Sequence, residues 1–233
     1  MAVKKFCVIG LGYFGLNLAL RLSESGAEVL AIDIDQEKVN LIADRVTHAV
    51  CMDTTDLTTL KSMGIEEMDA AIVAIGEGFE SSLMTSALLQ EIGVKNIYNR
   101  VISSVHERLL KLMGISHLLV PEADAAAKLA NMLLIPGIID SLELSEEYGI
   151  FEILAPAVFV GKTLIELNVR ENYALNIVTI KKQFVKRGLL SINEKEKTVI
   201  IGIPKPDTRI EKGDILVVFC KESSIKDLLA EAE

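Results

Sequence analysis

The chain has 233 residues, half of them apolar, which is enough for one large or two modest domains with buried cores. Its formal net charge of −9 argues against nucleic-acid binding, which needs clustered lysine and arginine. No apolar run reaches the roughly 18 residues that a membrane span needs, and the N-terminus lacks the pattern of a signal peptide. Cys7, Cys51 and Cys220 are odd in number and lie in apolar stretches, so we expect buried, reduced thiols, as in the cytoplasm.

Residues 6–15 join an apolar strand pattern to three glycines spaced G-x-G-x-x-G. Gly10 permits a sharp turn, Gly12 lets a phosphate approach the backbone, and Gly15 lets the following helix lie close to the strand. The first turn of that helix offers unpaired N–H groups and the positive end of its dipole to an anion. Taken alone, the motif is also compatible with a tight strand-to-helix turn that binds nothing.

A second apolar strand, residues 29–32, leads directly into Asp33. This carboxylate follows the glycines by about twenty residues, which is the spacing of the dinucleotide-binding fold. A carboxylate at that position can accept hydrogen bonds from both hydroxyls of a ribose. The glycine turn and Asp33 together therefore predict a nucleotide-binding site.

Helices and strands then alternate along the first half of the chain. We expect a helix over 36–45 capped by Asp35, a strand over 48–51, a helix capped by Thr55 or Asp56, a strand over 70–75, a helix over 81–91, a strand over 96–101, a helix over 105–113 and a strand over 117–120. Six strands in this alternation predict an α/β fold with a doubly wound, parallel Rossmann-type sheet. Ligands of such sheets lie beyond the carboxyl ends of the strands. Those ends carry Gly10, Asp33, Asp53, Gly76, Arg100 and Glu122.

We expect a nucleotide-binding domain over 1–135, a hinge over 136–145 and a smaller α+β domain over 146–233. The helix 123–134 is apolar nearly all round, so it should be buried, with another subunit as one possible cover. The smaller domain should contain strands over 150–154, 176–181, 198–201 and 214–219, a helix over 163–167, a polar loop over 193–197 and a final helix capped by Ser223.

Signatures of common catalytic sites are missing from the sequence. It has no G-x-S-x-G, H-E-x-x-H, C-x-x-C or Walker lysine motif. His48, His106 and His117 lie on or beside predicted core elements, where a structural role is the default. The second domain offers no clear acid or base of the kind that a dehydrogenase needs. These features favour a protein that senses a nucleotide without transforming it, and not an enzyme.

Seven short segments, in order along nearly the whole chain, carry a family resemblance. They are residues 8–15, 31–35, 53–56, 73–77, 89–93, 121–122 and 142–147. With them the chain resembles the cytoplasmic regulatory subunits of Ktr/Trk-type potassium uptake systems. Those subunits combine an RCK domain (regulator of conductance of K⁺) with a TrkA-C-type domain.

The resemblance implies a homo-oligomeric ring, typically an octamer made of dimers, on the cytoplasmic face of a membrane potassium transporter. The family binds ATP or ADP, and some members bind NAD(H), in the cleft of the first domain. A Mg²⁺ or other cation at the phosphates is an option. Carried over by position, the phosphates lie at Gly10, Leu11, Gly12, Tyr13, Phe14 and Gly15, the ribose at Asp33, and the adenine at Asp53 and Thr54. Ile34 is a further expected residue of this site. Ile75, Gly76 and Glu77 would close the cleft, Arg100 would reach phosphate, and Glu122 would lie near the terminal phosphate or a bound metal cation.

Two features bear on which ligands this chain takes. Many ATP-responsive members of the family have arginine where this chain has Tyr13. An arginine can pair with a γ-phosphate, whereas tyrosine offers only a neutral hydroxyl, so ATP, ADP, AMP and NAD(H) all stay open. Related regulators bind cyclic di-AMP between two copies of the second domain. The corresponding positions here are Val169, Arg170, Ile177 and Pro204, and residues 183–197 form a longer segment than the usual hairpin.

Three other functions stay open from the sequence. The main alternative is an NAD(P)-dependent oxidoreductase. A redox-sensing transcriptional repressor is disfavoured by the acidic balance and by the lack of a helix-turn-helix pattern. A scaffold that binds no ligand is the third. Under the leading hypothesis, nucleotides with different affinities for two ring shapes set the state of the transporter.

Overall fold

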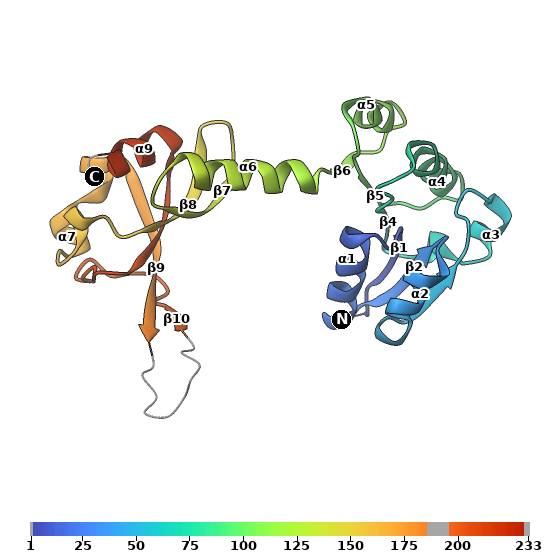
Figure 1. Ribbon diagram of the computed structural model, residues 1–233, viewed down its shortest axis with the longest axis horizontal. Helices are drawn as coiled ribbons and strands as arrows, with labels where there is room; N and C mark the ends of the chain where they lie inside the picture. Colours follow the sequence, from blue (N-terminus) through green and yellow to red (C-terminus); the bar gives the residue numbers. More distant parts are fainter. Residues whose placement is uncertain (1, 186–195, 231–233) are drawn as a thin grey trace. The chain divides into compact units, whose positions relative to one another are not determined.

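The structure is a computed structural model that describes residues 2–185 and 196–230 (Figure 1). The chain divides into two compact units, Met1–Pro121 and Glu122–Glu233. Each unit has hydrophobic clusters of its own, two in the first and one in the second. Most of the predicted polar loop 193–197, and of the long segment 183–197, lies outside the described residues.

The first unit is a six-stranded parallel sheet of order β3-β2-β1-β4-β5-β6 with helices between the strands. The order reverses beside β1, which confirms the predicted doubly wound sheet. Its elements are β1 (Lys5–Ile9), α1 (Tyr13–Glu24), β2 (Glu28–Asp33), α2 (Gln36–Ile42), a 3₁₀ turn (Ala43–Arg45), β3 (His48–Cys51), α3 (Leu57–Lys61), a second 3₁₀ turn (Ile65–Glu67), β4 (Ala70–Val73), α4 (Phe79–Glu91), β5 (Ile97–Arg100), α5 (Ser104–Leu112) and β6 (His117–Leu119).

The central strands are buried on both faces because helices cover the sheet on each side. In β1, Val8 belongs to the cluster that packs with α1 and α2. Its neighbours Cys7 and Ile9 point to the opposite face and pack with residues of α3, α4 and α5. All four residues of β4, Ala70–Val73, are buried. This is the continuous apolar pattern of a parallel strand covered on both faces.

Side-chain caps fix the start of three helices in this unit. Asp35 accepts a hydrogen bond from the Glu37 amide at 2.9 Å and begins α2, as predicted. Asp56, one of the two predicted caps, accepts from the Thr59 amide at 2.7 Å and begins α3. Ser103 caps α5 in the same way.

The second unit is a five-stranded antiparallel sheet of order β10-β9-β11-β8-β7 with short helices, which confirms the predicted smaller α+β domain. Its elements are α6 (Pro121–Leu134), β7 (Ile138–Glu143), β8 (Tyr148–Leu154), a 3₁₀ turn (Ala157–Phe159), α7 (Leu164–Leu167), α8 (Val169–Tyr173), β9 (Leu175–Val185), β10 (Glu196–Ile200), β11 (Ile215–Lys221) and α9 (Glu222–Ala230). α9 begins one residue before the expected cap, Ser223.

The segment 136–145, which we expected as a hinge, contains β7. This strand pairs with β8 along its length, and Ile138 is buried in the core of the second unit. The boundary between the two compact units falls after Pro121 along the chain, so nearly all of α6 belongs to the second unit. From the sequence, we expected residues up to 135 in the first domain. Pro136 and Gly137 end the helix, but a break in a helix does not show on which side of it the packing changes.

Helix α6 is not buried within this chain. It has no buried residue, and Leu133 and Leu134 are 75% and 78% exposed. The sequence expectation of a buried helix is therefore wrong for the single chain, because much of its apolar pattern comes from five alanines, whose small side chains bury little surface. A second subunit as its cover stays a prediction.

The cysteines and histidines differ in burial according to their places in the fold. Cys7 and Cys220 are buried, and burial raises the pKa of the Cys220 thiol to about 11. Cys51 is exposed, against expectation, because β3 is the edge strand of its sheet. His106 is fully buried, whereas His48 and His117 are exposed. In the described part of the chain no helix has the length and hydropathy to cross a membrane.

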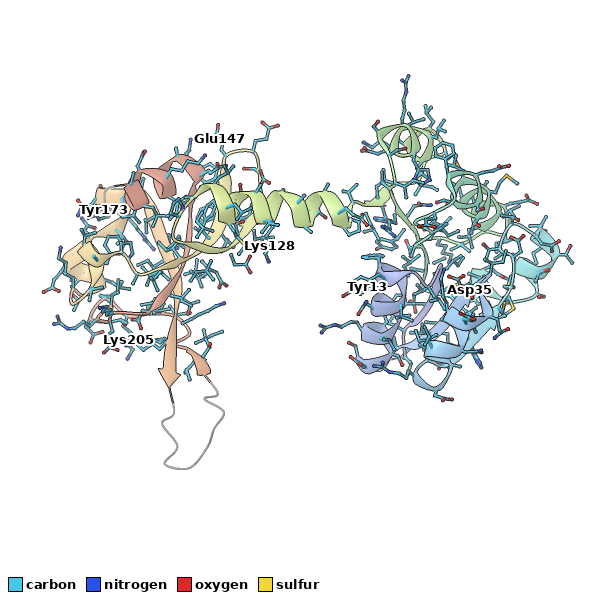
Figure 2. The ribbon with its side chains drawn as sticks, in the orientation of Figure 1. Tyr13, Asp35, Lys128, Glu147, Tyr173 and Lys205 are labelled. Carbon is cyan, nitrogen blue, oxygen red and sulfur yellow. The ribbon has the colours of Figure 1, made fainter. Side chains whose placement is uncertain are left out.

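Lys128, labelled in Figure 2, links α6 to β7 by an ion pair with Asp140 at 2.8 Å (Nζ to Oδ1). The hydrogen bond from Lys128 holds the pKa of the Asp140 carboxyl below its usual range. We expect Asp140→Asn to lower the free energy of unfolding by only about 0.5 kcal/mol at pH 7, because both side chains are substantially exposed.

The direction of the pKa shift of Asp140 determines how its contribution to stability depends on pH. A carboxyl with a lowered folded pKa stabilises the fold above its unfolded pKa of roughly 3.9, and this contribution is lost as the pH falls through the folded pKa. The difference between wild type and Asp140→Asn in urea denaturation should therefore shrink below about pH 4. Lys128→Met is the matched control and should remove most of the effect of Asp140→Asn, with a remainder from the Ser141 amide, which donates to Asp140 Oδ1 at 2.7 Å, and from the charge of Lys181. A difference that grows on acidification would contradict the assignment.

Candidate functional site

A cavity of about 540 Å³ lies at the carboxyl ends of β1 to β5 in the first unit. This is where a doubly wound sheet binds ligands. The residues that line it are Ile9, Gly10, Gly12, Tyr13, Asp33, Ile34, Lys38, Met52, Asp53, Thr54, Ala74, Ile75, Gly76, Glu77, Ser81 and Arg100. The volume falls within the range of roughly 300–1,000 Å³ that small-molecule sites occupy.

The three glycines of the turn are required for different reasons. Gly10 has φ +93°, and a Cβ there would lie 2.9 Å from the Ile75 amide nitrogen. A Cβ on Gly15 would lie 1.9 Å from the Gly10 carbonyl oxygen. A Cβ on Gly12 would meet no atom within 4 Å, and its φ of −64° suits any residue. The fold therefore needs Gly10 and Gly15, whereas the missing side chain of Gly12 only keeps the cavity open.

The N-terminus of α1 faces the same cavity through Gly12 and Tyr13. Gly12 is the N-cap residue and has no side chain to satisfy the first amides, and the first turn contains no acidic residue. An anion at this end would meet unpaired N–H groups and the positive end of the helix dipole. Tyr13, labelled in Figure 2, is 89% exposed.

Asp33 connects the end of β2 to the glycine turn. Its Oδ2 accepts a hydrogen bond from the Leu11 amide at 2.5 Å, and its Oδ1 accepts from the Asp35 amide at 2.9 Å. The side chain is only 8% exposed, yet it lines the cavity. Lys38 of α2 reaches back so that its Nζ lies 4.0 Å from Asp33 Oδ1. These contacts hold the carboxylate in place, and each oxygen keeps a lone pair for a ligand hydroxyl.

The loop after β3 forms a further polar wall. Oδ1 of Asp53 accepts hydrogen bonds from the Thr55 amide and hydroxyl, at 2.9 and 2.7 Å. These bonds hold the pKa of the Asp53 carboxyl below its usual range, so it is ionised at neutral pH. Thr54 is nearly buried, and its Oγ1 lies 2.8 Å from Thr85 Oγ1 of α4.

Arg100 is the last residue of β5, and its guanidinium packs over Gly76. A Cβ at Gly76 would lie 2.5 Å from Arg100 Nη1, so glycine at this position makes room for the guanidinium. Arg100 and Lys38 are the two cationic side chains that line the cavity. Asp33, Asp53 and Glu77 supply three carboxylates. The cavity can therefore receive an anionic group and a polyhydroxyl group at different places.

The cavity brings together most of the residues that the sequence proposed for the nucleotide. They are Gly10, Gly12, Tyr13, Asp33, Ile34, Asp53, Thr54, Ile75, Gly76, Glu77 and Arg100. Leu11, Phe14 and Gly15 do not line it. Leu11 is buried and Phe14 partly buried in the cluster beside α1 and α2, and Gly15 packs against the turn. These three support the turn without facing the cavity.

Five lining residues were not proposed from the sequence: Ile9, Lys38, Met52, Ala74 and Ser81. The sequence could have indicated Lys38 as a lining residue, because it lies in the first turn of the helix that follows Asp33. Glu122 belongs to the second unit and is not among the lining residues. Among residues 2–185 and 196–230, no group of three or more histidine, cysteine, aspartate or glutamate side chains could hold a metal ion. The metal role of Glu122 stays a prediction.

The four positions proposed for cyclic di-AMP differ from one another in burial within the second unit. Val169 and Ile177 are buried in its hydrophobic core. Arg170 is exposed and donates from Nε and Nη2 to Asn176 Oδ1, at 3.1 and 2.9 Å, and Pro204 is half-buried. The two buried side chains contribute to packing within this chain. A cyclic di-AMP site stays a prediction from the sequence.

Comparison with known proteins gives two family matches that follow one another along the chain. Residues 6–121 match the TrkA-N domain, and residues 149–232 match the TrkA-C domain. Ktr system potassium uptake protein C of Bacillus subtilis is 40% identical over 213 residues, which cover 90% of this chain and 96% of that protein. The chain belongs to the Ktr/Trk family of potassium-uptake regulatory proteins. This confirms the resemblance drawn from the seven segments.

Other Ktr/Trk relatives agree with this assignment. Ktr system potassium uptake protein A of Bacillus subtilis is 35% identical over 223 residues, covering 96% of this chain and 94% of that protein. The TrkA-N match and the first compact unit both end at residue 121, and the TrkA-C match begins within β8. These relatives place the chain with potassium-uptake proteins and not with the NAD(P)-dependent oxidoreductases that the sequence left as an alternative.

Solved structures support the fold of this Ktr/Trk chain. The crystal structure of the GsuK RCK domain matches with a TM-score of 0.65 at 16% identity, covering 100% of this chain and 49% of that one. The GsuK channel bound to NAD matches with a TM-score of 0.64 at 18% identity, covering 100% and 40%. The chain thus spans about half or less of these GsuK chains. At such identities the matches show a shared fold alone.

Proposed function

We propose that this chain is a cytoplasmic, nucleotide-sensing regulatory subunit of a membrane potassium transporter. An adenine nucleotide binds in the cavity of the first unit. The observation that carries this proposal is Gly12, whose missing side chain leaves open space that the fold itself does not require. A phosphate group can use that space, because it can approach the amides of the α1 N-terminus with no Cβ in the way.

The cavity offers a separate place for each part of the nucleotide. The α1 N-terminus and the Arg100 guanidinium suit the phosphates. The Asp33 carboxylate suits the ribose hydroxyls. The loop carrying Asp53 and Thr54 then bounds the space left for the base. This proposed assignment follows the position-by-position expectation drawn from the family.

An adenosine 5′-phosphate group is the shared feature of ligands named for similar structures. One is the GsuK channel bound to NAD. Another is the Kef C-terminal domain of Shewanella denitrificans in its AMP-bound form, which matches with a TM-score of 0.50 at 18% identity and covers 56% of this chain and 80% of that one. Both ligands support an adenine nucleotide here. The ligand that we propose is one of ATP, ADP, AMP and NAD(H), with a Mg²⁺ ion at the phosphates as an option.

The regulatory step is a shift between two shapes of a homo-oligomeric ring, an octamer assembled from dimers and held on the inner face of the cell membrane by the transporter. A ligand moves such an equilibrium only by binding the two shapes with different affinity. Moving it from 1:99 to 99:1 takes roughly 5.5 kcal/mol in total, which several identical sites can supply in small parts.

Calorimetric titration of the full chain with ATP, ADP, AMP and NADH tests the proposal. At least one should bind with a stoichiometry of one per chain, and scattering profiles of the purified oligomer should differ between two bound nucleotides. Flat titrations with all four would leave the scaffold alternative standing. A nicotinamide absorbance change with a carbonyl or alcohol substrate would instead support the oxidoreductase.

Asp33→Asn should weaken the binding of adenine nucleotides by about ten- to a hundredfold. A charged acceptor contributes roughly 1.5–3 kcal/mol per hydrogen bond, and the amide also turns an NH₂ group toward one of the two backbone donors, Leu11 and Asp35. The same variant should lower the thermal midpoint of the unliganded protein. Isothermal titration with ADP checks the first effect and differential scanning calorimetry the second. Asp44→Asn is the control, because Asp44 is an exposed carboxylate that does not line the cavity.

A further inference from the structure

The face of α4 that packs against the sheet is unusually polar. Ser82, Thr85 and Ser86 are fully buried together with Leu89, which places hydroxyl groups at three of the four inward positions of the helix. A helix that packs on a sheet normally turns an apolar face inward. Buried hydroxyl groups need hydrogen-bond partners, so each of them indicates a specific contact.

Two of these hydroxyl groups connect α4 to β5. Ser86 Oγ donates to the Ser82 carbonyl oxygen at 2.6 Å and accepts from Asn99 Nδ2. Ser82 Oγ donates to Asn99 Oδ1 at 3.2 Å. These contacts form one closed set that includes no residue lining the cavity.

Thr85 is different because its hydroxyl leads to the cavity. Its Oγ1 lies 2.8 Å from Oγ1 of Thr54, which lines the cavity and is 6% exposed, whereas Thr85 is 0% exposed. Within the described residues, Thr54 Oγ1 is the one hydrogen-bond partner of the Thr85 hydroxyl. Ser86 donates to the carbonyl one helical turn back, whereas in the part of the chain that the structure describes Thr85 makes no such bond.

Burial decides the direction of this hydrogen bond. A hydroxyl has one proton to donate and two lone pairs to accept with, and a buried donor without an acceptor is destabilising by about 1–3 kcal/mol. If Thr54 donated, the proton of the fully buried Thr85 would have no acceptor. If Thr85 donates, Thr54 keeps its own proton for the cavity, where water or a ligand accepts it. The chain of donors therefore runs from Thr85 to Thr54 to the cavity.

We propose that Thr85 is a positioning residue that makes the Thr54 hydroxyl a hydrogen-bond donor to the bound ligand. This inference rests on the proposed function, because it concerns the base of an adenine nucleotide. The group that Thr54 meets must then be an acceptor. In adenine the ring nitrogens N1, N3 and N7 are acceptors, whereas the 6-amino group is a donor and does not fit.

Titration of four variants of the full chain with ADP tests the inference. Thr54→Val should weaken binding by about tenfold and Thr85→Val by about threefold, the range of one hydrogen bond between neutral groups. The double variant should bind like Thr54→Val alone, because Thr85 acts only through Thr54. Thr85→Ser keeps the hydroxyl and should bind like wild type.

Ser86→Ala is the matched control, since it removes a buried hydroxyl from the same helix face. It should lower the thermal midpoint and leave the dissociation constant of ADP within about twofold. ADP analogues in which CH replaces one ring nitrogen test the acceptor. One of the 1-deaza, 3-deaza and 7-deaza analogues, the one that lacks the nitrogen contacted by Thr54, should bind wild type about tenfold more weakly than ADP. Thr54→Val should remove that difference.

The outcomes separate the two claims. If wild type does not bind ADP or another adenine nucleotide, the proposed function fails and this inference fails with it. If wild type binds and either Thr85→Val binds as tightly or the losses of the two single variants add in the double variant, the inference alone is overturned. Equal binding of all three deaza analogues would overturn it as well.

Discussion

Gly12→Val should reduce the affinity of the chain for an adenine nucleotide by about a hundredfold or more, while the unliganded protein keeps its stability. The valine side chain enters space in which a Cβ meets no protein atom within 4 Å. The backbone of Gly12 already has angles that valine adopts. The steric conflict therefore arises only when a phosphate approaches the α1 N-terminus, and crowding at close contacts typically amounts to about 1–3 kcal/mol or more.

Titration with ADP measures the loss, and the thermal midpoint of the unliganded variant measures the stability. Gly12→Ala should give an intermediate loss because it adds one methyl group to the same space. Nucleotide binding unchanged in both variants would mean that the phosphates lie elsewhere. A large drop in the thermal midpoint would mean that Gly12 serves the fold after all.

Gly15→Ala should lower the free energy of unfolding by about 3 kcal/mol or more, with or without a nucleotide. A Cβ on Gly15 would lie 1.9 Å from the Gly10 carbonyl oxygen, which belongs to the backbone and cannot turn aside as a flexible side chain can. The methyl group would force α1 away from β1 and separate the core contacts of Val8 and Ala19.

Urea denaturation of the full chain, followed by far-UV circular dichroism, measures this loss. Asn17→Ala is the control, because it adds an alanine to an exposed position of the same helix and should change the stability by roughly 0.5 kcal/mol or less. A Gly15→Ala protein as stable as wild type would show that the helix and the turn are not in close contact in solution.

The sequence was sufficient for the parallel sheet because its signals are local and repeated. Each central strand is a short apolar run, and polar caps such as Asp35 mark where helices begin. The alternation of the two patterns then leaves few topologies, and the doubly wound order is one of them. The same argument placed Gly10, Asp33, Asp53 and Gly76 at one edge of the sheet, where they line the cavity.

The second unit shows where this reasoning fails. β7 contains Asp140 and Ser141 and lacks a clean alternation of apolar and polar residues, so its sequence predicts a connecting segment. Only its pairing with β8 defines it as a strand. α8 spans five residues between Asn168 and Ala174, which both have positive φ and are not glycine. Local propensity does not favour such a turn, and the burial of Val169 in the core supports it instead.

The lining residues that the sequence is least able to predict lie on helices and reach the cavity through their side chains. Strand ends can be counted along a sequence, but the direction of a long side chain depends on the packing of its helix. Lys38 and Ser81 lie on α2 and α4 and line the cavity for that reason. The pairing of Thr54 with Thr85 joins residues 31 positions apart, and no periodic pattern connects them.

The hydrogen bond from the Leu11 amide to Asp33 joins two groups of the protein and needs no atom of a ligand. If the cavity binds a nucleotide as we propose, the carboxylate and the glycine turn hold each other in place, and the ligand has less of the protein to order on binding. Association should then be fast and similar for related nucleotides, so that discrimination among them appears in how long each one stays. Under the proposed function, the chain would then distinguish its ligands by residence time and not by association rate.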